Sequence, residues 1–180
     1  RVRHHVENFS IIKTLHSLNR CDVALVFMDA LEGVRDQDLT VAGYAHERGC
    51  GCILLMNKWD LVRADERTAK ARRHELKHAA GFLAFAPRLS VSALTGQHLG
   101  KIFPLIDNVY QQYSTRIGTG EFNRILEDAV ASREPPLHRG RRIKLYYGTQ
   151  IRNKPPTFVC FANYPEAIHF PYRRYLANAI

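Results

Sequence analysis

The stretch that most constrains the fold is a short apolar run over residues 52–56, which ends abruptly in Asn57-Lys58-Trp59-Asp60. A short run of this kind, bounded by polar residues, is typical of a strand buried on both faces. Similar runs at 22–28 and 89–91 lie on either side of it, and stretches with helical periodicity separate the three. Strands that alternate with helices predict a parallel sheet with helices on both faces. Ligands bind at the carboxyl ends of the strands in such sheets, where this polar tetrapeptide falls.

The pattern changes after residue 115. Residues 116–120 form a short linker, and a helix, two strands and a helix are then expected over 121–132, 143–150, 157–162 and 172–179. That order is consistent with a small α+β module. The helices expected before the linker cover 7–18, 36–49, 64–80 and 99–113, with Asp36 as the cap of the second.

The polar tetrapeptide carries side chains that suit the edge of a guanine base. One carboxylate, at Asp60, can accept hydrogen bonds from both N1–H and N2–H2 of guanine, a pair of donors that adenine lacks. Asn57 can donate to a ring nitrogen or tie neighbouring loops together, and the stem of Lys58 can lie along the base. A chance tetrapeptide is the alternative, because the ends of strands often carry polar residues.

A second strand ends in a comparable way. Residues 88–91 run into Ser92-Ala93-Leu94, where the backbone N–H of Ala93 could donate to guanine O6, an acceptor that adenine does not have. Two such segments in this order, separated by one helix, favour guanine recognition over chance. The candidate guanine-binding residues are Asn57, Lys58, Asp60, Ser92, Ala93 and Leu94.

These two motifs are similar to the last two guanine motifs of translation-factor-type GTPases. More narrowly, the chain resembles the Der (also called EngA) family of double-GTPase ribosome assembly factors, over the second GTPase domain and the KH-like domain that follows it. The other segments that fit this family lie at 7–10, 29–33, 37–38, 122–127, 144–150, 155–158 and 172–176. The resemblance covers essentially all 180 residues.

The resemblance implies an α/β fold: a partial P-loop GTPase with a three-layer parallel sheet, followed by a small α+β KH-like domain. We expect residues 1–115 to be the C-terminal portion of a GTPase (G) domain. Residues 116–180 would be the KH-like domain, truncated at its C-terminus because its final strand would lie beyond Ile180. In the sheet order of the family, the strand at 22–28 would be an exposed apolar edge.

The resemblance also implies cofactors and partners for the intact bacterial protein. These are GTP or GDP with Mg²⁺, the large ribosomal subunit and its rRNA, and a preceding GTPase domain in the full-length chain. The longest apolar run, residues 23–28, is far too short to span a bilayer. No basic-then-apolar leader opens the chain, so we expect a cytoplasmic protein without membrane association.

The sequence has neither a P-loop nor D-x-x-G, the motifs that hold the phosphates and Mg²⁺ in GTPases. The segment at 96–102 is one residue short of the P-loop spacing and lacks its Ser or Thr. By the resemblance, the chain begins just after D-x-x-G, so residues 1–6 would be the tail of the switch region. We therefore expect the intact protein to hydrolyse GTP. This chain alone would be inactive, with no catalytic residue and no tightly bound nucleotide.

One apparent metal motif is expected to bind no metal. His74-Glu75-Leu76-Lys77-His78 has the H-E-x-x-H spacing of zinc proteases. At about 100° per residue, however, both histidines fall on the side of the helix opposite Leu76, among charged residues. A catalytic zinc also needs a third ligand and a walled cavity, which the sequence does not supply. The cysteines at 21, 50, 52 and 160 contain no C-x-x-C and are expected to be reduced.

Positive charge is concentrated in the second part of the chain. Residues 1–115 hold 15 basic and 12 acidic residues, a net +3, and residues 116–180 hold 11 and 5, a net +6. The segment 135–165 has six basic residues and no acidic one. This block suits a polyanion, although a solvated basic face or contact with a companion domain is the alternative. The candidate RNA-binding residues are Arg139, Arg141, Arg142, Lys144, Arg152, Lys154, Arg173 and Arg174.

KH domains that bind RNA grip its backbone with a G-x-x-G loop, which this sequence lacks. We therefore expect docking on folded ribosomal RNA mainly through phosphates, with little sequence preference. Because side chains alternate along a strand, at most one of Tyr146 and Tyr147 is expected to face outward, and the other to be core. Two further functions stay open: a non-enzymatic basic RNA-binding module on an α/β scaffold, and an unrelated basic α/β enzyme.

Overall fold

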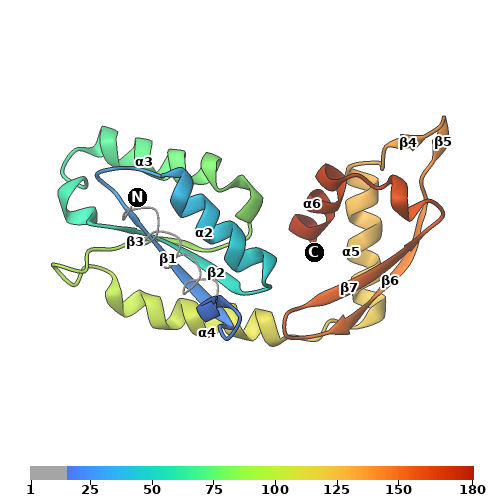
Figure 1. Cartoon of the computed structure of the whole chain (residues 1–180), viewed down its shortest axis with the longest axis horizontal. Helices are drawn as coiled ribbons and strands as arrows, with labels where there is room; N and C mark the ends of the chain where they lie inside the picture. The colour runs from blue at the N-terminus through green and yellow to red at the C-terminus, as the bar shows by residue number, and fades with distance from the viewer. Residues whose placement is uncertain (1–15) are drawn as a thin grey trace, which may run out of the picture. The chain divides into compact units, whose positions relative to one another are not determined.

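The computed structural model describes residues 16–180 (Figure 1). Contacts within the chain divide it into two compact units, residues 1–113 and 114–180. The segment 1–6 lies outside the described residues, as does most of the helix expected over 7–18, of which residues 16–18 are described and are helical. No helix in the described part of the chain is both long and apolar enough to cross a membrane.

In the first unit, the described strands form one parallel sheet in the order β1-β2-β3. Its strands are β1 (Val23–Asp29), β2 (Gly51–Asn57) and β3 (Arg88–Ser90). β2 is the central strand and its side chains are buried along almost the whole strand. The parallel sheet that the alternating pattern predicts is confirmed. β1 lies at an edge of this sheet, where the Phe27 side chain is exposed.

Helices cover both faces of this sheet (Figure 1). On one face, Ala24, Val26 and Met28 of β1 share a core with α2 (Asp36–Glu47) and α3 (Glu66–Ala79). On the other face, Ile53 and Leu55 of β2 pack with α4 (Ile102–Ser114). The described part of this unit also contains short 3-10 turns: η1 (Trp59–Leu61), η2 (Gly81–Leu83) and η3 (Leu99–Lys101). The result is the expected three-layer arrangement.

The start of α2 differs from the sequence-based expectation. Arg35, rather than Asp36, has the extended backbone of a capping residue, and Asp36 is the first helical residue. The acidic contact comes instead from Asp38, whose Oδ2 accepts a hydrogen bond from the Arg35 N–H at 3.1 Å. Both carboxylates still lie in the first turn, where the helix dipole favours negative charge.

The second unit contains two α-helices packed on an antiparallel pair of strands, so the expected α+β order is confirmed. Its main elements are α5 (Thr119–Ser132), β6 (Leu145–Arg152), β7 (Thr157–Ala162), η4 (Pro165–Ala167) and α6 (Phe170–Ala179). A small hairpin that the sequence did not predict, β4 (Leu137–His138) with β5 (Arg141–Arg142), precedes β6. Its two-residue turn has positive φ at both Arg139 and Gly140, the geometry that suits tight hairpins.

The core of the second unit is built around Phe122 of α5. This side chain is fully buried, and its ring stacks on Phe158 with centroids 4.7 Å apart. A Cβ on Gly148 would lie 2.4 Å from Phe122 Cε1 and 2.9 Å from the Val159 carbonyl oxygen. Only glycine therefore lets β6 approach the helix this closely.

A bulge in β6 overturns the expectation for the two tyrosines. Leu145 lies opposite Ala162 and Tyr147 lies opposite Phe161, so Tyr146 is an extra residue in β6. An inserted residue interrupts the alternation of side chains. Tyr146 is 62% exposed and Tyr147 is 50% exposed, so neither belongs to the core.

Candidate functional site

The carboxyl end of β2 turns sharply and is fastened to the end of β3. Lys58 has a left-handed backbone, with φ of 59°, which turns the chain into η1. The Trp59 N–H then donates to the Val91 carbonyl oxygen at 3.0 Å, and the Val91 N–H donates to the Met56 carbonyl oxygen at 2.8 Å. These two bonds hold Asp60 at the edge of the sheet where both strands end.

The structure brings the two sequence motifs together through Asn57. Its Oδ1 accepts a hydrogen bond from the Ala93 N–H at 3.0 Å. The loop after β3 is closed by buried Ser92, whose Oγ accepts from the Thr95 N–H at 3.1 Å. The Ala93 N–H, expected to be available for guanine O6, is thus already engaged, so a base that used it would share this donor with Asn57. The Leu94 side chain extends into solvent beside it.

Asp60 has an unused acceptor. The residue is half-buried, and its Oδ1 is buried without a hydrogen-bond partner among the described residues. A buried polar atom left unpaired costs on the order of 1–3 kcal/mol, and more for a charged group. Nearly all such atoms in proteins find a partner. A ligand that donates hydrogen bonds at this edge would supply one.

Sequence reasoning missed Asp29, which ends β1 opposite Asn57. Its Oδ2 lies 2.5 Å from Lys58 Nζ. This bond to the Lys58 ammonium lowers the pKa of Asp29, and the carboxylate raises the pKa of Lys58 in return. Asp29 therefore fixes the head of the lysine whose stem was expected to lie along the base. An acidic residue at the end of the neighbouring parallel strand was the signal that could have identified it.

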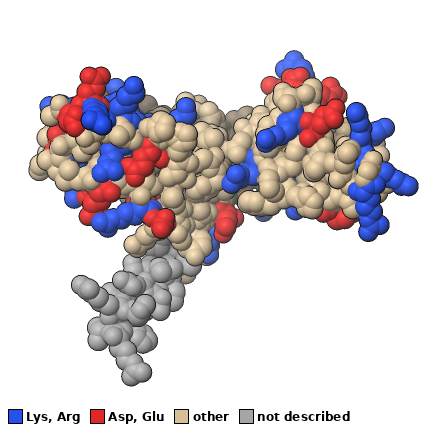
Figure 2. All heavy atoms as spheres, turned by 90° about the horizontal axis from the view of Figure 1, so that it is seen from above, with Lys and Arg blue, Asp and Glu red and all other residues tan. Residues whose placement is uncertain are grey.

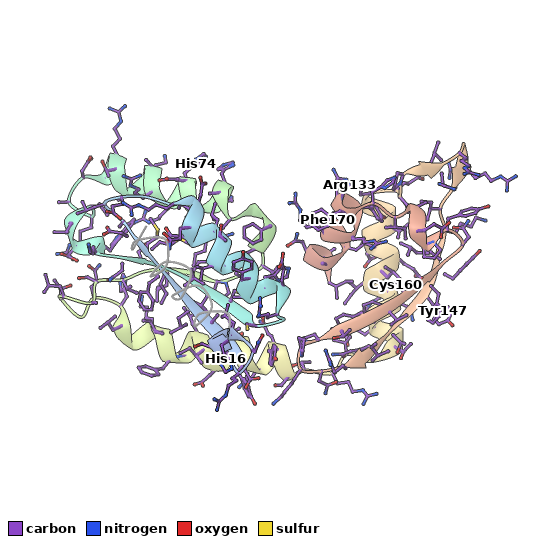
Figure 3. All side chains as sticks on the ribbon, viewed as in Figure 1. His16, His74, Arg133, Tyr147, Cys160 and Phe170 are labelled. Atoms are coloured by element: carbon purple, nitrogen blue, oxygen red, sulfur yellow. The ribbon has the colours of Figure 1, made fainter. Side chains whose placement is uncertain are left out.

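Both histidines of the H-E-x-x-H segment are exposed on α3, and His74 is labelled on that helix in Figure 3. Their Nε2 atoms lie 3.0 Å apart. Glu75 is directed elsewhere, because its Oε1 accepts from the Val34 N–H at 3.1 Å and its Oε2 lies 2.8 Å from Arg72 Nη1. Within residues 16–180, no group of three or more His, Cys, Asp or Glu side chains could hold a metal ion.

The four cysteines are free thiols. Burial raises the pKa of Cys50 to about 11 and that of Cys52 to about 12, so both stay protonated at neutral pH. A thiol in this state is a poor nucleophile and a poor metal ligand. Cys50 and Cys52 therefore act as small apolar side chains within the first unit.

The basic residues of the second unit do not all have the same surroundings. Lys and Arg side chains gather at one end of it, where Figure 1 places β4 and β5 (Figure 2). Arg173 is engaged inside the unit, because its Nε donates to the Ile168 carbonyl oxygen at 2.7 Å. Arg142 lies 3.7 Å from Glu134, and Arg141 donates to the Tyr164 hydroxyl at 3.3 Å. The exposed residues without a side-chain partner in the described part of the chain are Arg139, Lys144, Arg152 and Arg174.

Comparison with known families matches both units. The model described as the elongation factor Tu GTP binding domain matches residues 7–114. The model described as KH-domain-like of EngA bacterial GTPase enzymes, C-terminal, matches residues 116–180. Similar curated proteins include GTPase Der of Desulforapulum autotrophicum, 51% identical, and GTPase Der of Syntrophotalea carbinolica, 47% identical, each over all 180 residues. The chain spans 37% and 41% of the length of these two relatives.

Solved structures give weaker similarities. Translation elongation factor SelB from Methanococcus maripaludis, in complex with the GTP analogue GPPNHP, matches 53% of this chain and 22% of its own, with 21% identity and a TM-score of 0.49. Era in complex with MgGDPNP and nucleotides of 16S ribosomal RNA matches 92% of this chain and 61% of its own, with 17% identity and a TM-score of 0.47. The sequence matches are the stronger finding. By them, the chain belongs to the GTP-binding domain family of elongation factor Tu and, within it, to the Der (EngA) GTPases, whose KH-domain-like module forms its second unit.

Proposed function

We propose that this chain recognises the guanine base of GTP and GDP, and that the full-length protein is a GTP hydrolase. The observation that carries the proposal is Oδ1 of Asp60, which is buried and has no hydrogen-bond partner within residues 16–180, at the edge where Asn57 joins the Ala93 loop. Membership in a GTP-binding domain family supports it. The proposed guanine-binding residues are Asn57, Lys58, Asp60, Ser92, Ala93 and Leu94.

Asp60, Lys58, Asn57 and Ala93 each have a chemical role in this proposal. The two oxygens of Asp60 accept hydrogen bonds from guanine N1–H and N2–H2, which adenine cannot offer as a pair. The stem of Lys58 covers the base while Asp29 holds its ammonium. Asn57 positions the Ala93 N–H, which Asn57 and guanine O6 share. A site built on such donors and acceptors rejects a base that leaves them unpaired.

Hydrolysis is expected from the full-length protein and not from the 180-residue chain alone. Phosphoryl transfer depends on groups that position and neutralise the phosphates, and the sequence holds neither a P-loop nor D-x-x-G. We assign no residue of this chain to the Mg²⁺ that accompanies GTP. Phosphate release at saturating GTP and Mg²⁺, measured on both proteins, tests this. Turnover by the chain alone would place the phosphate site within it, and an inactive full-length protein would contradict the proposed activity.

We further propose that the second unit binds ribosomal RNA of the large subunit during its assembly, a role exercised in the cytoplasm. The excess of basic residues over 116–180 supports this, as does the absence of any acidic residue between 135 and 165. Of the candidate residues, Arg173 is best explained as structural, because its guanidinium is bonded to the Ile168 carbonyl oxygen. The others remain candidates for phosphate contacts.

Binding of large subunits or their RNA is expected to weaken log-linearly with salt, because each phosphate contact releases counterions. Each Arg→Ala change at a phosphate-contacting residue, such as Arg139→Ala, should reduce the slope of the logarithm of the binding constant against the logarithm of the salt concentration by about one. Arg173→Ala is a matched control whose slope should stay unchanged. Filter binding between about 50 and 200 mM salt measures this. Full binding after the charges of Arg141, Arg142 and Lys144 are reversed together would instead indicate that these residues keep the protein soluble or contact a companion domain.

A further inference from the structure

The sheet formed by β6 and β7 in the second unit has two different faces. Gly148 faces α5, as its close approach to Phe122 shows. Because side chains alternate along a strand, Tyr147 and Thr149 on either side of Gly148 point to the opposite face. On that face, Phe161 of β7 lies opposite Tyr147, and the two rings stack with centroids 4.5 Å apart and planes inclined by 19°.

This second face, which we call the open face, is aromatic and accessible. Tyr147 is 50% exposed and Phe161 is 43% exposed. Within residues 114–180, the buried core lies on the other side of the strands, toward α5 and α6. Exposed aromatic groups gathered on one surface are typical of an interaction site. The remaining question is what chemistry would cover them.

The charges at the two ends of β6 favour a polyanion. Lys144 directly precedes β6 and Arg152 ends it, so a cation stands at each end of the strand. Neither side chain has a partner in the described part of the chain. No carboxylate occurs between 135 and 165. β6 has eight residues, which span about 26 Å at about 3.3 Å per residue.

We propose that the open face binds unpaired bases of single-stranded RNA, which stack on Tyr147 and Phe161 while Lys144 and Arg152 contact the backbone phosphates. Every base has a flat π face, so stacking on aromatic side chains tolerates any sequence, and cations along the strand track the backbone. This inference rests on the RNA binding proposed above and names the class of RNA. It also adds base stacking to the expectation of contact mainly through phosphates, because the rings of Tyr147 and Phe161 are exposed.

A binding experiment with two RNA probes tests the open face. Fluorescence anisotropy of the 180-residue chain is measured with a labelled single-stranded oligo(U) of twelve nucleotides and with a twelve-base-pair RNA duplex. We expect tighter binding of the single strand. Tyr147→Ala with Phe161→Ala should weaken single-strand binding by about 10-fold or more, with little effect on the duplex and with the salt slope unchanged. Tyr147→Phe should retain binding, since the ring remains.

Tyr146→Ala is the matched control. Tyr146 is on the same strand and is at least as exposed, but it borders a groove with Leu126 and Glu127 of α5 rather than the open face. Its removal should leave single-strand binding unchanged. The inference is wrong if the double variant binds oligo(U) like the unmodified chain, or if it loses duplex and single strand equally. It is also wrong if neither RNA probe binds the chain and the double variant no longer binds intact large ribosomal subunits. That result would indicate that the open face contacts a protein. If the double variant binds oligo(U) normally, or loses both probes equally, RNA binding that still weakens steeply with salt would leave the broader RNA proposal standing.

Discussion

Replacing Asp60 with Asn is expected to weaken guanine nucleotide binding by on the order of 100-fold or more and to shift the preference toward xanthine. The carboxylate accepts two hydrogen bonds from guanine in the proposed site, and bonds to charged groups contribute about 1.5–3 kcal/mol each. An amide keeps one acceptor and presents a donor where guanine also has a donor. Xanthine has a carbonyl at the position of the guanine amine, so it can accept from that amide.

Displacement of a fluorescent GDP analogue from the full-length protein measures this, with GDP and XDP as competitors. Asp65→Asn is the control, because Asp65 is exposed and caps α3 by accepting from the Arg67 N–H at 3.1 Å. Asparagine caps helices as well as aspartate does, so this variant should bind GDP normally. Unchanged GDP affinity in Asp60→Asn would mean that Asp60 does not contact the base.

Phe122→Ala is expected to destabilise the second unit by about 3–5 kcal/mol, the usual cost of removing a large aromatic ring from a core. The ring is fully buried, stacks on Phe158 and fills the space that Gly148 leaves open. Urea unfolding followed by tyrosine near-UV circular dichroism should show the loss. Phe170→Ala is the matched control, because that ring is 72% exposed and its removal should change stability by less than about 0.5 kcal/mol.

The first unit should be unaffected by Phe122→Ala, because its core residues form clusters separate from those of the second. The single tryptophan of the chain, Trp59, is buried in the first unit and reports on its unfolding. If Phe122→Ala shifts the urea midpoint of the Trp59 signal as much as that of the tyrosine signal, the two units unfold together. An unchanged tyrosine transition would contradict the described core.

The elements that the sequence predicted best are those whose burial is uniform. β2 is covered by helices on both faces, so its apolar run is uninterrupted and its position follows from composition. The β4–β5 hairpin escaped prediction because each strand has two residues, too few for any periodicity. The tyrosines of β6 were misplaced because alternation assumes a regular strand, and a bulge is set by pairing with β7.

The site could be predicted only in part. Its residue types and order indicate guanine, and the structure places Asn57 against the Ala93 backbone. The acidic residue at the end of β1 was visible in the sequence, but its pairing with Lys58 depends on the register between β1 and β2, which no local pattern contains. The engagement of the Ala93 N–H depends on one side-chain conformation at Asn57. That these residues bind guanine stays a prediction.

The most direct test of guanine recognition is the relative affinity of the unmodified full-length protein for GDP and ADP, measured in the same displacement assay. The two ligands share the diphosphate and ribose, so their difference isolates the base. Adenine lacks the N1–H and N2–H2 donors for Asp60 and the O6 acceptor, and we expect ADP to bind on the order of 100-fold more weakly or worse. Equal affinity for GDP and ADP would contradict a guanine site at the carboxyl ends of β2 and β3.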